Sequence, residues 1–293
     1  MSVKIVFPEI TNQTIQDAIK LATEKYGTDF EPVGADSLEN ACLSVKNGIA
    51  DAMIAGIDYT SREVILACRD IIGMKDKSAP RIHPISGHQL KKTFSACFLM
   101  TREQNSESED EDLENFIDVP ETYIVADAAA CKHPTEDQLY DIVVQTHETA
   151  TKLFKKNGET PCVAMLSFST LGSGGDDESI MRIHQVLGRI KNNHPEIIID
   201  GELQLDAAID PIVAEKKAPA SKVAGHANVL ICPDLNSGNI LYKAMERFGG
   251  FTAAGPILQG FNAPASDLSR GSTVPDVLSV IDAIMILSRS END

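Results

Sequence analysis

Short apolar runs alternate with segments of helical periodicity along most of this chain. A short apolar run bounded by turn residues is typical of a buried strand, whereas apolar residues at every third or fourth position are typical of a helix. Strands are predicted at Lys4–Phe7, Ala52–Ala55, Phe94–Met100, Tyr123–Ala126, Val163–Phe168, Ile197–Ile199, Val229–Cys232 and Thr252–Pro256. Helices are predicted at Thr14–Glu24, Leu38–Lys46, Arg62–Ile72, Glu136–Lys155, Glu178–Asn192, Gly238–Arg247 and Pro275–Ser288. This alternation predicts the α/β class, with a largely parallel sheet and helices on both faces.

Two segments interrupt the alternation. Residues 73–92 combine glycines and prolines with several lysines and arginines, Arg81 among them, and are predicted to form a long, basic, irregular loop. Residues 107–114 are an acidic run, which is typical of a solvated loop or of the tip of a hairpin.

Composition narrows the class of protein. At 293 residues the chain is long for one core, so two domains of about 150 residues are expected. Its net charge of −17 argues against duplex DNA or an anionic membrane as the main partner, because both would repel such a surface. The chain has no apolar run of about 18 residues, so no transmembrane helix is expected.

The six cysteines show no C-x-x-C spacing, and most lie in apolar surroundings. Free buried thiols in a reducing compartment are therefore expected, which predicts a cytoplasmic protein. For lack of paired ligand spacing, no zinc site is expected.

Candidate chemistry is concentrated near the end of the chain, where Ser269, Arg270 and Asp276 lie in a glycine-rich and proline-rich stretch. A serine hydroxyl can donate to a carbonyl oxygen that gains charge, and a guanidinium can bind phosphate with several donors. A carboxylate can take the proton of a thiol. These groups suit acyl transfer between a thiol and a phosphate. Structural roles remain open as alternatives: a surface ion pair, a turn, and an acid at a helix N-terminus.

Two further loops follow predicted strands. Hydroxyl and N–H groups in the first could bind a phosphate, and the alternative is a capping loop; its candidates are Ser167, Ser169, Thr170, Gly172 and Ser173. In the second, Asn236 and Asn239 open a helix after a strand end, a ligand-facing position or an N-cap.

Ordered sequence blocks contain these residues, at 163–173, 199–208, 217–219, 223–229, 233–240, 255–260 and 267–271. Through these blocks the chain resembles phosphate acetyltransferases of the phosphate acetyl/butyryl transferase family. Gln259 and Gly260, in the block 255–260, join the predicted substrate-binding residues.

The resemblance implies a specific fold and reaction. It implies two three-layer α/β domains with an active-site cleft between them, in a layout like that of isocitrate and isopropylmalate dehydrogenases. The predicted domains are residues 1–92 with 264–293, shortened relative to the family, and residues 93–263. The implied reaction is acetyl-CoA plus phosphate giving CoA plus acetyl phosphate. The resemblance also implies a homodimer. It implies neither a metal nor a tightly bound cofactor, with CoA or acetyl-CoA as substrate.

The chain departs from the family pattern at several positions. Leu66 and Leu171 replace an arginine and a lysine, and Ser272 replaces a cysteine. Arg62, one helical turn before Leu66, could reach the same space. We expect residues of the basic loop, Arg81 in particular, to supply other missing cations.

Two alternatives follow from these departures. One is a homologue that has lost catalysis and only binds its ligand. The other is an acyltransferase for longer chains, propionyl or butyryl.

Overall fold

The computed structural model describes residues 2–75, 93–102, 122–155 and 157–289. In this part of the chain, helices and strands alternate and most paired strands are parallel, which confirms the predicted α/β class. The chain divides into two compact units, residues 1–97 with 254–293, and residues 98–253. The predicted domain boundaries, the dehydrogenase-like layout and its cleft stay predictions.

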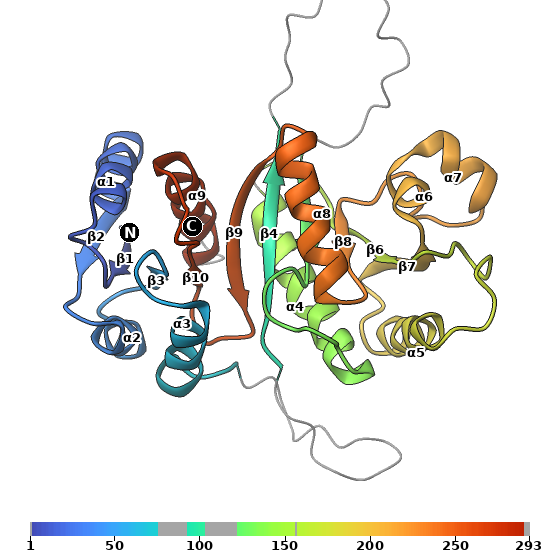
Figure 1. Ribbon diagram of the computed structural model, residues 1–293, viewed down its shortest axis with the longest axis horizontal. Helices are drawn as coiled ribbons and strands as arrows, with labels where there is room; N and C mark the ends of the chain where they lie inside the picture. The colour runs from blue at the N-terminus through green and yellow to red at the C-terminus, as the bar shows by residue number, and fades with distance from the viewer. Residues whose placement is uncertain (1, 76–92, 103–121, 156, 290–293) are drawn as a thin grey trace, which may run out of the picture. The chain divides into compact units, whose positions relative to one another are not determined.

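The first unit is built on strands in the order β2-β1-β3-β10-β9, with only the β10–β9 pair antiparallel. The strands are β1 (Val3–Phe7), β2 (Phe30–Gly34), β3 (Ala52–Ala55), β9 (Thr252–Gln259) and β10 (Ala265–Asp267). Its helices are α1 (Gln13–Tyr26), α2 (Leu38–Lys46), α3 (Ser61–Ala67) and α9 (Val274–Ser288). Helices α1 and α9 lie side by side (Figure 1), where Asp282 accepts hydrogen bonds from Lys25 and Tyr26, both at 2.7 Å.

Local sequence explains why the elements around the candidate residues begin where they do. Strand β3 is buried along its whole length and consists of small and apolar residues. Helices α3 and α9 each begin with a capping box, in which the N-cap threonine and an acid three residues later bond to each other's backbone N–H. The two boxes fix the first turns of both helices.

The second unit has strands in the order β4-β5-β8-β6-β7. They are β4 (Ser95–Thr101), which begins in the first unit, β5 (Thr122–Ala126), β6 (Cys162–Leu166), β7 (Ile198–Leu203) and β8 (Val229–Ile231). Its helices are α4 (Glu136–Lys155), α5 (Glu178–Asn193), α6 (Leu205–Ile209), α7 (Pro211–Lys217) and α8 (Leu235–Phe248). Because β5, β8, β6 and β7 are parallel neighbours, the loops after them emerge at the same edge of the sheet.

Two strands and two α-helices were not predicted from the sequence. Strand β2 contains a proline and a glycine and buries only Phe30, so its apolar signal is weak. Strand β10 has three residues, two of them polar although all are buried. Helices α6 and α7 are short and separated by Asp210, which caps the second.

Disulfides, membrane-spanning helices and clusters of metal ligands are absent from the part of the chain that the structure describes. Its six cysteines are free thiols. In the described ranges, no helix is long and apolar enough to cross a membrane, and no group of three metal-ligating side chains is placed to hold an ion. Arg81 and the remainder of the basic loop beyond Lys75, like the acidic run 107–114, lie outside the described residues.

Candidate active site

The turn between β10 and α9 exposes Ser269 and Arg270 at the surface of the first unit. Three hydrogen bonds shape this turn. The N–H of Ser269 donates to Ser272 Oγ at 3.1 Å, and the N–H of Ser272 donates to the carbonyl of Ser269 at 2.9 Å. The N–H of Gly271 donates to Ser269 Oγ at 3.3 Å. Because Ser269 Oγ acts as an acceptor in this turn, its own proton remains available for a substrate oxygen.

Arg270 lies close to the first turn of α3. The pKa of Glu63 is lowered, mainly by hydrogen bonds from the hydroxyl and N–H of Thr60, and to a smaller degree by the positive charge of Arg270. Arg62 precedes Glu63 on the same helical turn and is exposed. The structure therefore brings both predicted cations, Arg62 and Arg270, to one corner of the first unit.

Asp276 is the acid of the capping box of α9. Its Oδ2 accepts from the N–H and the hydroxyl of Thr273, both at 2.8 Å. The structural role left open by the sequence is thus present. Among the described residues, Asp276 Oδ1 has no hydrogen-bond partner, so the cap leaves one oxygen of the carboxylate for a further proton.

Closely packed residues at the ends of β3 and β10 support the turn of Ser269 and Arg270. The N–H of Leu268 donates to the carbonyl of Ala55 at 2.6 Å. A Cβ added to Gly56 would lie 2.5 Å from the carbonyl oxygen of Leu268 and 2.6 Å from Asp267 Oδ1. Glycine is required here, because both its φ of +117° and this close approach exclude a side chain.

Two buried carboxyl groups, those of Glu9 and Asp267, lie among these supporting residues. Glu9 accepts from the N–H groups of Gly56, Asp58 and Tyr59 at 2.9, 2.5 and 3.2 Å. Burial raises the pKa of Glu9, although these bonds oppose the shift. Burial also raises the pKa of Asp267 to about 6; a hydrogen bond with Ser61 opposes this shift and the charge of Glu9 adds to it. Sequence reasoning missed both residues as parts of the site.

Gln259 is the last residue of strand β9, and Gly260 follows it. Gln259 is buried, and its Oε1 accepts from the hydroxyl of Ser95 at 2.8 Å. The carbonyl of Gly260 accepts from the N–H of Lys75 at 2.9 Å. These contacts hold the strand end in place, and the substrate-binding role of both residues stays a prediction.

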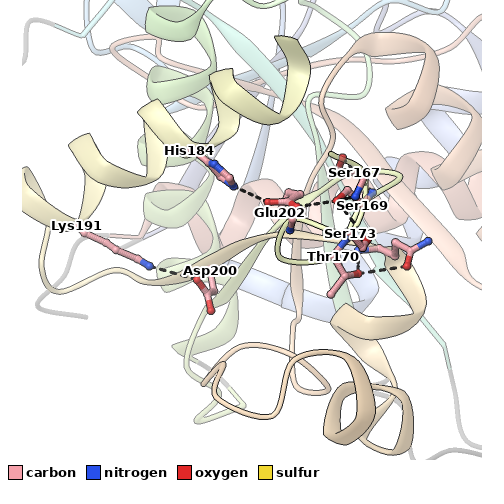
Figure 2. Close-up of polar contacts among 11 residues, drawn as sticks. Ser167, Ser169, Thr170, Ser173, His184, Lys191, Asp200 and Glu202 are labelled. Carbon is pink, nitrogen blue, oxygen red and sulfur yellow. Dashed lines mark hydrogen bonds and ion pairs between the residues drawn. The ribbon is translucent and has the colours of Figure 1, made fainter. Parts of the chain in front are cut away.

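In the second unit, the five predicted residues after β6 form one compact loop (Figure 2). Ser169 and Thr170 are buried, and their hydroxyls bond to Glu202 Oε1 at 2.8 Å and to Gln204 Oε1 at 3.3 Å. Ser167, Gly172 and Ser173 are more accessible. The loop thus uses its two buried hydroxyls to hold its own shape, and substrate binding by its members stays a prediction.

The N–H groups of this loop are also engaged internally. Those of residues 169 and 170 donate to Ser167 Oγ and Ser173 Oγ, at 3.3 and 2.9 Å. Those of residues 171 and 172 donate to the carbonyl and carboxylate oxygens of Glu202, at 3.0 and 2.6 Å. Those of residues 173, 174 and 175 donate to Thr170 O, Ser169 Oγ and Gly172 O, at 3.1, 2.7 and 3.2 Å. A phosphate cradle of N–H groups, as the sequence suggested, would have to break these bonds.

Glu202 organises the loop and was not among the predicted site residues. Its side chain is fully buried, and its Oε2 lies 2.6 Å from His184 Nε2 on α5. In the sequence, Glu202 is one of several acidic residues between Asp200 and Asp206, and nothing there marks it as part of this loop. No sequence spacing linked Glu202 to His184, since the contact depends on the packing of α5 against β7.

Asn236 and Asn239 lie in the first turns of α8, which follows β8. The N-cap of this helix is Asp234, whose carboxylate accepts from the N–H of Ser237 at 2.9 Å. Asn236 is exposed and Asn239 half-buried. The cap function therefore belongs to Asp234, and the proposed ligand-facing role of the two asparagines stays a prediction.

The fold and these loops place the chain among α/β enzymes, which present ligand-binding loops at the carboxyl ends of parallel strands. The chain belongs to the phosphate acetyl/butaryl transferase family, whose model matches residues 9–286.

Relatives are consistent with this assignment. A phosphate acetyltransferase of Treponema pallidum is 39% identical over 86% of this chain and 68% of its own length. One of Clostridium acetobutylicum is 38% identical over 93% of this chain and 78% of its own length. The predicted family, and the prediction of a phosphate acetyltransferase, a transferase enzyme, are confirmed by these matches.

Solved structures with the same fold include proteins of this kind. A phosphotransacetylase from Streptococcus pyogenes has a TM-score of 0.78 and 30% sequence identity, and the match covers 98% of this chain and 94% of that one. A branched-chain phosphotransacylase from Enterococcus faecalis V583 has a TM-score of 0.75 at 19% identity, covering 99% and 100% of the two chains, and supports the fold alone.

Proposed function

We propose that this chain exchanges an acetyl group between CoA and inorganic phosphate, by direct attack of phosphate on the thioester in a ternary complex. The turn of Ser269 and Arg270, followed by the half-capped carboxylate of Asp276, carries the proposal. It supplies a hydroxyl donor, a permanent cation and a proton acceptor within eight residues. In this mechanism no covalent acyl-enzyme forms.

The direction that forms the thioester shows how the roles divide. Asp276 takes the proton of the CoA thiol, whose ordinary pKa of about 8.5 leaves it mostly protonated at neutral pH. The thiolate attacks the acyl carbon of acetyl phosphate, a C–S bond forms, and the C–O bond to phosphate breaks. Ser269 donates to the carbonyl oxygen as it gains charge, and Arg270 binds the departing phosphate. The proton finally resides on the released phosphate.

Arg62 is proposed as a second cation for the phosphates of the substrates, because it shares a corner of the first unit with Arg270. Arg81 keeps the same proposed role from its position in the basic loop. The loop after β6, with Ser167, Gly172 and Ser173 at its surface, and Asn236 with Asn239 are proposed to contact CoA.

A homodimer in the cytoplasm is also proposed. Exposed apolar side chains of the second unit, such as Ile212 and Ile240, offer surface that a second copy could cover. Free thiols fit a reducing compartment. Light scattering of the purified chain, compared with its formula mass of 31.7 kDa, tests the dimer.

The test of function is turnover with CoA and acetyl, propionyl or butyryl phosphate side by side, followed by thioester absorbance. We expect thioester formation, fastest with acetyl phosphate. Preference for a longer chain would favour the alternative acyltransferase. CoA binding in calorimetry without turnover on any of the three would favour a homologue that has lost catalysis, an alternative motivated by the lost arginine at Leu66.

A further inference from the structure

The tip of the loop after β6 is held in an unfavourable conformation. Leu171 has a φ of +46°, in the left-handed region, and no other described non-glycine residue has a positive φ. This conformation costs a non-glycine residue about 1–2 kcal/mol. Its side chain nevertheless stands 47% exposed, and the neighbouring Phe168 is 61% exposed. Strain that the surrounding structure maintains is typical of functional sites.

Glu202, which lies beside Ser169 in Figure 2, maintains this conformation. Its backbone carbonyl accepts from the N–H of Leu171 at 3.0 Å, and its carboxylate accepts from the N–H of Gly172 at 2.6 Å. The same carboxylate oxygen accepts from the hydroxyl of Ser169 at 2.8 Å. One buried residue therefore fixes both sides of the strained tip.

The carboxylate is stable in this buried position as an anion. Burial alone would raise the pKa of Glu202, but the hydrogen bonds from Gly172, Ser169 and His184 outweigh it and lower the pKa. His184 binds the second oxygen from the surface side, with about half of its side chain exposed. Both oxygens of the Glu202 carboxylate thus have hydrogen-bond partners within the protein, so its charge does not require a bound ligand.

The large exposed side chains of the tip are apolar. Each N–H from residue 169 to residue 175 is used within the loop or by Glu202, so none is free to bind a phosphate. A Cβ added to Gly174 would lie 2.7 Å from the ring of Phe168 and 2.8 Å from Ser169 Cβ, so the loop is tightly packed beneath the ring. The large side chains that the loop exposes to solvent are the ring of Phe168 and the side chain of Leu171, next to the smaller, also exposed Ser173.

We propose that Glu202 is a positioning residue that holds Phe168 and Leu171 as an apolar contact for the non-phosphate part of CoA. This inference rests on the proposed function, in which CoA is a substrate. An aromatic ring and a branched aliphatic chain suit the pantetheine arm or the adenine ring, by van der Waals contact and stacking. The loop emerges at the carboxyl edge of β6, where ligands of α/β proteins bind. Acetyl phosphate has no comparable group.

The first test separates the two substrates. In Phe168→Ala/Leu171→Ala, the KM for CoA should rise about tenfold, which corresponds to about 1.4 kcal/mol. The KM for acetyl phosphate should stay within about twofold of the wild-type value, because that substrate lacks an apolar arm. Glu202→Ala should likewise raise the KM for CoA about tenfold and leave the KM for acetyl phosphate within about twofold of the wild-type value. The control is Glu196→Ala, which removes an exposed carboxylate that is also paired with a histidine, His194 at 3.1 Å.

The second test asks whether Glu202 acts through the tip. In a double-mutant cycle, Glu202→Ala should raise the KM for CoA in the wild-type background and leave it unchanged once Phe168 and Leu171 are alanine. A merely structural role would lower the thermal midpoint and impair both backgrounds and both substrates alike. If Glu202→Ala does not fold, Glu202→Gln takes its place, because its amide oxygen can still accept from Ser169 while the charge is lost.

The outcomes are distinct. A wild-type KM for CoA in Phe168→Ala/Leu171→Ala overturns the inference and leaves acetyl transfer intact. A change from dimer to monomer in light scattering, with both KM values unchanged, also overturns it and assigns the tip to a subunit interface. If the wild type shows no turnover, calorimetry with CoA decides independently: about tenfold weaker binding by the variant supports the inference although the proposed function has failed.

Discussion

Asp276 and Thr273 cap α9 reciprocally: the Thr273 N–H and hydroxyl both donate to one carboxylate oxygen of Asp276, at 2.8 Å. The other oxygen has no partner among the described residues. One side chain can thus have two separable functions, a helix cap and a proton acceptor. The cap also fixes the orientation of the carboxylate, since rotation about the side chain would break two hydrogen bonds.

Two substitutions of Asp276 separate these functions. In Asp276→Asn, the amide oxygen can still accept from Thr273, so the thermal midpoint should change little. Thioester formation should fall by about 10²–10⁴, the usual contribution of a general base. Asp276→Ala should lose the activity and also about 1 kcal/mol of stability with the cap. Thermal melts and initial rates measure both, and part of the lost rate should return as the pH rises toward the thiol pKa of about 8.5. Activity of Asp276→Asn at the wild-type level would exclude the proton-transfer role.

Arg270 is expected to contribute charge stabilisation that a structural arginine does not. Arg270→Ala should lower kcat by about 10²–10³, as the loss of one donor to a developing charge does elsewhere. The matched control is Arg247→Ala on α8, since Arg247 is exposed and pairs only with its neighbour Glu246 at 3.6 Å among the described residues. Both variants should melt near the wild-type temperature. Equal rates for the two variants would contradict the role of Arg270.

Local features of this protein could be predicted from the sequence, and features that depend on packing could not. Helix α4 matches its prediction to the residue, because twenty residues of sustained periodicity with acids at the start leave little ambiguity. Ser269, Arg270 and Asp276 could be proposed as candidates because they lie together in the chain, and their catalytic roles stay predictions. Strand β10 was missed, because its three residues become a strand only through pairing with β3 and β9.

The buried acids show the same limit. Glu202 contacts partners 18 to 33 residues away, on a loop and on a helix, and no local pattern announces such contacts. Glu9 likewise binds N–H groups 47 to 50 residues downstream. In both cases the sequence shows only an acidic residue in an apolar stretch. That pattern does not tell which distant groups donate hydrogen bonds to the carboxylate.

Asp267 should make stability depend on pH. Its pKa is about 6 in the folded protein and about 3.9 when unfolded, so the folded state holds the proton more tightly. The resulting stabilisation is fully present below the unfolded pKa and is lost as the pH rises through about 6. Its size is on the order of 2–3 kcal/mol. Asp267→Asn cannot ionise, so its stability relative to wild type should increase between pH 5 and about pH 7.5. Urea unfolding at both pH values measures this; a constant difference would contradict the buried acid.

Gly56 tests whether the residues that support the turn of Ser269 and Arg270 must be closely packed. Gly56→Ala should be compared with Gly48→Ala, because both glycines have positive φ, +117° and +72°, but only Gly56 has neighbours within 4 Å of an added Cβ. Backbone strain should cost both variants about 1–2 kcal/mol. Gly56→Ala should lose a further 1–3 kcal/mol or so, as overpacked sites do.

The position of that clash adds a functional consequence. The displaced atom would be the carbonyl oxygen of Leu268, one residue before Ser269, so Gly56→Ala should also reduce acetyl transfer while Gly48→Ala leaves it unchanged. Urea unfolding and initial rates measure the two effects. Equal loss of stability in both variants, with equal activity, would show that the turn of Ser269 and Arg270 keeps its geometry without support from β3.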